Sequence, residues 1–129
     1  MVSQYQHDWL MRQIESFAIF LAKKIFDRDQ VAYEIADETH LNETDMLHNK
    51  LMALLEQHRI CEAENLLFNE LDETKKEHLR VALDFYQRLN RLSSEELEAH
   101  NFSRDEIKDG ISEVLSRFKL SGLMALSMW

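Results

Sequence analysis

Apolar side chains recur at intervals of three and four residues along almost the whole chain. This spacing places them on one face of an α-helix and is not the alternation of a strand. Proline, which breaks helix interiors, does not occur, and glycine occurs only twice in the 129 residues. The pattern predicts an all-α fold, a compact single-domain bundle of about five to seven helices over residues 1–129.

The first predicted helix, residues 3–26, is apolar around most of its circumference. Its main stripe and its further apolar positions comprise Trp9, Leu10, Met11, Ile14, Phe17, Ile19, Phe20, Leu21, Ile25 and Phe26. Such a helix must be covered on several sides. We therefore expect it to be central in the bundle or to contact a second chain.

The middle of the chain predicts three helices. A short one carries Val31, Ala32, Ile35 and Ala36. The next is capped by Asn42 or Thr44 and ends near His58, and another follows at once with Ala63 and Leu67. So short a connection predicts that the last two pack antiparallel as a hairpin.

The part of the chain after residue 71 predicts a long helix starting at Asp72 or Thr74, then two capping boxes, Ser93 with Glu96 and Ser103 with Glu106. Phe102 and Ile107 occupy the positions of a hydrophobic staple around the second box. The tail, residues 120–129, is apolar and uncharged, so we expect it to dock on its own chain or on another.

Charge and composition narrow the classes of partner. The net charge of -9 opposes binding to nucleic acid, and the longest apolar run of the first helix, residues 17–22, is too short to span a membrane. The opening of the chain lacks the basic start of a signal peptide. A single cysteine, Cys61, excludes an internal disulfide and makes a cytoplasmic location the default.

Three stretches resemble an uncharacterised family of small bacterial all-helical proteins: residues 5–14 (YQHDWLMRQI), 61–68 (CEAENLLF) and 92–107 (LSSEELEAHNFSRDEI). The resemblance implies a small cytoplasmic helical protein and no known activity, cofactor or site residue. Residues 54–68 also resemble one degenerate tetratricopeptide-type hairpin, although the Trp, Gly and Pro of that motif are absent.

One pattern is typical of metal sites in helical bundles. Asp37 precedes His40, and Asp45 precedes His48, each by one helical turn. Bundle metal sites use similar carboxylate and imidazole pairs, but with Glu as the acid. Both pairs also lie near predicted helix ends, where Asp and Asn serve as caps, so capping is the favoured interpretation.

The other reactive side chains favour no chemistry. Cys61 with His58 could form a nucleophile, but a small apolar filler is the more common role of a lone cysteine. We expect His7, His78 and His100 to be exposed among charged neighbours.

The leading hypothesis is a non-enzymatic helical module that acts through protein–protein contact, as a homodimer or with another protein, and without a cofactor. The alternative is a small metal-binding bundle protein or enzyme using Asp37, His40, Asp45 and His48; a ligand-binding bundle is a weaker third option. Candidate interface residues come from the first helix and the tail: Trp9, Met11, Phe17, Phe20, Met124 and Trp129.

Overall fold

The computed structural model describes residues 4–126 of the chain, which form six α-helices and one 3₁₀ helix and contain no strand. The all-α prediction is confirmed. The elements are α1 (Gln4–Phe26), α2 (Glu43–Glu56), α3 (Ile60–Glu70), α4 (Lys76–Asn90), α5 (Ser94–Ala99), α6 (Arg104–Arg117) and η1 (Ser121–Leu126).

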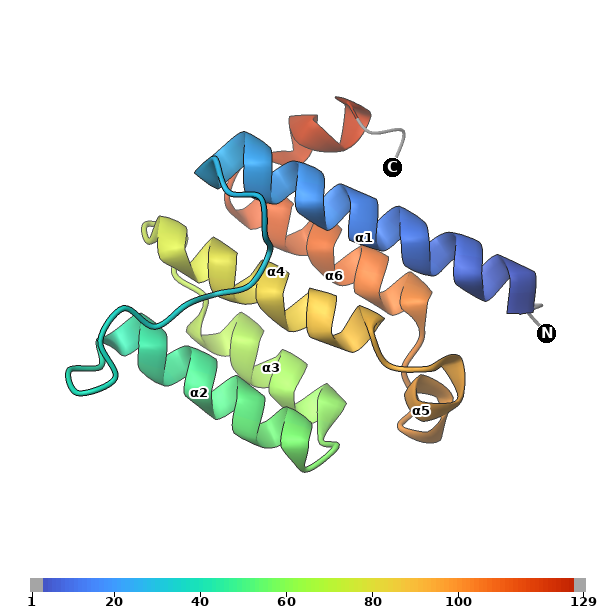
Figure 1. The fold of residues 1–129 in the computed structure, drawn as a ribbon, viewed down its shortest axis with the longest axis horizontal. Coiled ribbons are helices and arrows are strands. Elements are labelled where there is room, and N and C mark those ends of the chain that lie inside the picture. The colour runs from blue at the N-terminus through green and yellow to red at the C-terminus, as the bar shows by residue number, and fades with distance from the viewer. Residues whose placement is uncertain (1–3, 127–129) are drawn as a thin grey trace.

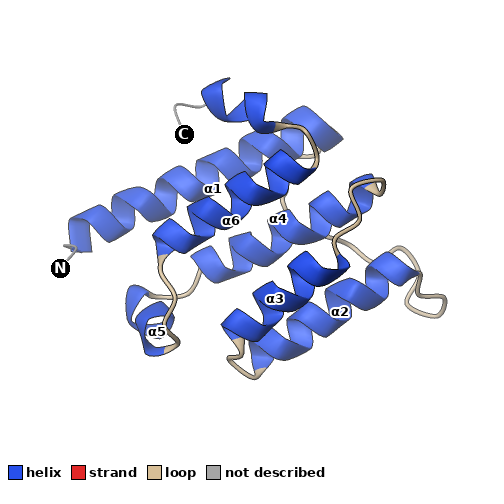
Figure 2. Cartoon of the chain, turned by 180° about the vertical axis from the view of Figure 1, so that it is seen from behind, coloured by secondary structure: helices blue, strands red, loops and turns tan. Residues whose placement is uncertain are grey.

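The helices form two groups that meet at α4 (Figure 1). On one side α1 and α6 pack against each other and against α4, which runs opposite to both. On the other side α2 and α3, joined by residues 57–59, form a hairpin that packs on α4 through α2. The view from behind shows α5 at the end of the bundle, between α4 and α6 (Figure 2).

The helix at the centre is α4, so the first helix does not take the central position that was one of its two expected roles. Because α4 contacts α1, α2 and α6, it is buried nearly all round, including its polar residues Asp84, Gln87 and Asn90. Helix α1 buries one face, through residues such as Ile14 and Leu21, against α4 and α6. Its surplus apolar positions therefore do not make it the core of the bundle.

Helix starts follow local capping chemistry, and the structure decides between the predicted caps. Asn42, not Thr44, caps α2 in a capping box with Asp45. The boxes predicted at Ser93 and Ser103 are both present. In each, the side-chain oxygen accepts from the amide of the third helical residue, whose carboxylate accepts from the cap's own amide.

The predicted start of the long helix is wrong. The Asp72 carboxylate accepts hydrogen bonds from the amide and hydroxyl of Thr74, at 2.9 Å and 2.6 Å. This local turn uses both candidate caps, so α4 begins only at Lys76 and has no side-chain cap.

The short helix expected over Val31 to Ala36 is also wrong, since residues 27–42 contain no helix. Val31 and Tyr33 are buried whereas Glu34 is exposed, which is the alternation of an extended chain. The backbone is fixed by a tertiary contact, in which the guanidinium of Arg80 donates to the Ala32 carbonyl at 3.3 Å. We call residues 27–42 the strap, because they pass from α1 to α2 across α4 (Figure 1).

The described part of the tail docks on its own chain. The amide of Leu120 donates to the Leu115 carbonyl at 2.8 Å, turning the chain back so that η1 packs on α6. Leu120, Leu123 and Met124 are half-buried against the core. Residues 127–129, including Trp129, lie outside the described residues. None of the helices within residues 4–126 combines the length and apolarity that crossing a membrane requires.

Replacement of Ser103 by Ala tests the start of α6. Loss of the cap should lower the free energy of unfolding by about 1 kcal/mol. Urea denaturation followed by circular dichroism measures the change. Ser116→Ala, at an exposed position late in the same helix, is the matched control and should change stability little. Equal midpoints for Ser103→Ala and the parent protein would contradict the capping role.

A second prediction concerns the contact of α6 with α4. A Cβ at Gly110 would collide with the ring and hydroxyl of Tyr86, which is fully buried. Overpacking of this kind costs about 1–3 kcal/mol, more than the roughly 1 kcal/mol that Ala gains over Gly in a helix. Gly110→Ala should therefore lower the urea midpoint. Gly122→Ala meets no atom within 4 Å and should not, so equal effects would contradict this explanation.

Candidate functional site

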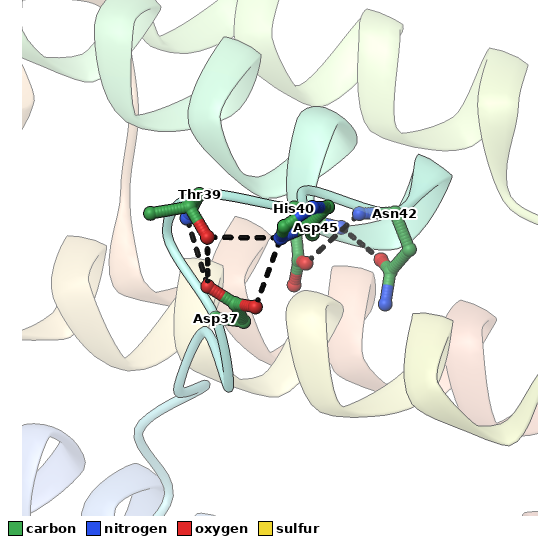
Figure 3. A network of polar contacts seen from close by, with 5 residues as sticks. All are labelled: Asp37, Thr39, His40, Asn42 and Asp45. Carbon is green, nitrogen blue, oxygen red and sulfur yellow. Dashed lines mark hydrogen bonds and ion pairs between the residues drawn. The ribbon is translucent and has the colours of Figure 1, made fainter.

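Two of the four candidate metal ligands form a closed turn in the strap (Figure 3). Asp37 accepts hydrogen bonds from the Thr39 amide at 2.9 Å and the Thr39 hydroxyl at 2.6 Å, and its second oxygen lies 3.1 Å from His40 Nδ1. Hydrogen bonds from Thr39, with a smaller one from His40, lower the pKa of the Asp37 carboxyl. All three residues are exposed, so the turn is a local surface motif.

The third candidate, Asp45, is buried at the start of α2. One oxygen of its carboxylate accepts from the Asn42 amide at 3.1 Å within the capping box, also drawn in Figure 3. The other accepts from the hydroxyl of Tyr33 in the strap, at 2.5 Å. Burial, followed by the bond to Asp45, raises the pKa of the Tyr33 hydroxyl. Asp45 therefore serves both as a helix cap and as an anchor for the strap.

The fourth candidate, His48, pairs with a carboxylate that the sequence did not single out. Its Nε2 lies 2.6 Å from the Oδ2 of Asp84 on α4, and both side chains are buried. The same oxygen accepts from Arg88 Nε at 3.0 Å. Burial alone would raise the pKa of Asp84, but the bonds from His48 and Arg88 outweigh it and hold the pKa below its usual value.

Tyr33 joins these contacts into one network, because its ring also packs on the His48 ring with 4.9 Å between centroids. The network connects the strap, α2 and α4, through Tyr33, Asp45, His48, Asp84 and Arg88. Asp37 and His40 bind each other on the exposed turn. Across residues 4–126, no group of three or more His, Cys, Asp or Glu side chains is arranged to hold a metal ion.

Tyr33, Asp84 and Arg88 were missed by the sequence analysis. Asp84 carried one usable signal, since it stands between Leu83 and Phe85 in an amphipathic helix, and a buried carboxylate requires partners. Arg88 follows Asp84 by four residues, and this helical spacing identifies Arg88 as one of the two partners. Nothing in the sequence indicates that the other is His48, 36 residues away.

Two expectations about single side chains are wrong. His78 is 5% exposed instead of solvated. Its Nδ1 accepts from the Asp72 amide at 3.0 Å, and burial lowers the pKa of the ring. Cys61 is exposed and is not an apolar filler, because it faces solvent in the first turn of α3. The nearby His58 stacks on His100, with ring centroids 5.3 Å apart.

The candidate interface residues occupy different environments. Trp9 is 52% exposed, Met11, Phe20 and Met124 are half-buried, and Phe17 is 3% exposed. Phe17 stacks on Phe20 with 6.0 Å between ring centroids. It therefore packs beneath a half-buried side chain and is not itself available to a partner. The sixth candidate, Trp129, lies outside the described residues.

Comparison with known families gives one match. The family described as "Family of unknown function (DUF6483)" matches residues 4–119. The chain belongs to this family. No curated protein and no solved structure matches the chain. Membership of DUF6483 agrees with the expected helical family without a known activity, while the bacterial origin and the tetratricopeptide likeness stay predictions.

Replacement of Tyr33 by Phe tests the anchor of the strap in this DUF6483 protein. The change removes a buried hydrogen bond to a carboxylate and should lower the free energy of unfolding by about 1–3 kcal/mol. It should also speed cleavage by trypsin after Arg28, which lies in the strap. Thr39→Ala, in the exposed turn, is the control. It should lower the free energy of unfolding and speed the cleavage much less than Tyr33→Phe does. Unchanged stability and unchanged cleavage in Tyr33→Phe would contradict the anchoring role.

Proposed function

We propose that this protein is a non-enzymatic helical module that works through protein–protein contact, and that it self-associates through the outer face of α1. The observation that carries the proposal is the exposure of two large apolar side chains on that face, Trp9 at 52% and Ile19 at 42%. Exposed aromatic and aliphatic residues on one surface are typical of interfaces.

The geometry of α1 separates this surface from the core. Ile14 and Leu21 face α4 and α6 and are fully buried. At 100° per residue, Trp9, Arg12 and Ile19 lie on the other side of the same helix. In both ribbon views α1 is at the edge of the bundle (Figures 1 and 2). A partner helix can therefore approach without displacing any described helix.

Charge complementarity favours a second copy of this chain as the partner. When two α1 helices cross antiparallel near residue 14, Trp9 of each copy meets Ile19 of the other. The same register brings Arg12 of each copy close to Glu15 of the other, and all four of these positions are exposed. One patch thus meets itself about a two-fold axis, as in most homodimers.

Sedimentation velocity at micromolar concentration tests the proposal. The parent protein should sediment as a dimer, and the double variant Trp9→Asp, Ile19→Asp as a monomer, because a charge in the centre of the contact has no partner. Leu41→Asp, Met46→Asp is the matched control, since these are the other large exposed apolar residues of the described chain. The control should remain dimeric.

The alternative is that the end of the tail covers α1 within one chain. Removal of residues 127–129 separates the two. A dimer that persists after truncation supports the α1 interface, whereas a dimer that forms only after truncation identifies the tail as an intramolecular cover. A parent protein that is monomeric throughout contradicts self-association.

A further inference from the structure

A small apolar cavity opens at the end of the α2–α3 hairpin, where the hairpin meets the last turns of α4. Its volume is about 210 Å³. Five apolar side chains from the three helices and the residues after α4 form most of its wall: Met52, Leu55, Ile60, Leu89 and Leu92. A cavity of this size accommodates a small molecule with one short apolar group.

The guanidinium of Arg88, which the buried network holds in place, lies on the wall of this cavity. Arg88 lines it, and its Nε donates to Asp84, which is 3% exposed and also bound by His48. This contact fixes one edge of the guanidinium. The two terminal nitrogens have no hydrogen-bond partner among the described residues, so they remain available to bind a carboxylate in a bidentate manner.

The carboxylate of Glu56 lies on the same wall. Glu56 is the last residue of α2, lines the cavity and makes no ion pair with any described residue, Arg88 included. The C-terminal end of a helix carries partial negative charge, which adds to the attraction of Glu56 for a cation. The cavity therefore offers an acidic group, a basic group, the ring of His58, which stacks on His100, and an apolar wall. Glu56 and Arg88 form no ion pair with each other.

We propose that this cavity binds a free apolar α-amino acid of about the size of leucine. The carboxylate of the ligand accepts from Arg88, its ammonium donates to Glu56, and its side chain fills the space between Met52, Leu55 and Leu92. A simple apolar acid would pair with Arg88 but would leave Glu56 without a cation. A simple apolar amine would leave Arg88 unmatched in the same way, so both halves of the zwitterion contribute to specificity.

Isothermal titration calorimetry with four probes tests the chemistry of the ligand. L-leucine should give saturable binding. Isocaproate lacks the ammonium, isoamylamine lacks the carboxylate, and glycine lacks the apolar side chain. Each should bind at least about tenfold more weakly than leucine, since each loses one charge-assisted contact or the apolar contact.

Variants assign the site. Arg88→Gln and Glu56→Gln should each weaken leucine binding by about tenfold or more. Arg91→Gln is the matched control, because Arg91 is an exposed arginine at the end of the same helix that does not line the cavity. Leu92→Phe should abolish binding by filling the cavity without touching the Asp84 network. The urea midpoint of each variant checks folding, and if Arg88→Gln unfolds, Glu56→Gln and Leu92→Phe decide.

Three results would overturn the proposal. The first is the absence of saturable leucine binding at millimolar concentration. The second is equal affinity for leucine and isocaproate or isoamylamine, which would mean that the charges do not select the ligand. The third is equal loss in Arg91→Gln and Arg88→Gln. The self-association test is independent, because Trp9 and Ile19 do not line this cavity.

Discussion

The buried carboxylate of Asp84 is the constraint on which the arrangement of this bundle depends. It lies in the middle of the central helix, where an unpaired charge would be strongly unfavourable. Its pairing with His48 and Arg88 satisfies that charge only when α2 sits against α4 in one register. Apolar packing alone would tolerate small shifts between the two helices, whereas a hydrogen bond of 2.6 Å does not.

The same network explains why a connection of 16 residues, 27–42, can be ordered without a helix of its own. Tyr33 places its hydroxyl on Asp45 and its ring on His48, and Arg80 of α4 lies over the Tyr33 ring and bonds the backbone of Ala32. The first half of the strap is therefore held by side chains of two helices, whereas the turn from Asp37 to His40 is closed by its own local hydrogen bonds. Long connections in compact domains usually carry such a role or a function.

Helix α4 also links the two surfaces to which we assign roles. Its buried side packs on α1, whose outer face is the proposed self-association surface. Its last turns carry Arg88 into the apolar cavity at the end of the hairpin. Arg88 is bound to Asp84. A change in the network at the centre of the bundle would therefore change the position of the Arg88 guanidinium in that cavity.

The sequence by itself determined the fold class, the six α-helices of the described chain and the starts of α5 and α6. These depend on local physics, namely the periodicity of apolar residues and the contact of Ser93 or Ser103 with amides three residues away. Only the tertiary structure decided that α4 and not α1 is central, that residues 31–36 are extended, and that Asp45 and His48 serve different partners. Those outcomes depend on contacts such as His48 with Asp84, 36 residues apart, and no local pattern encodes which distant group a polar side chain will meet.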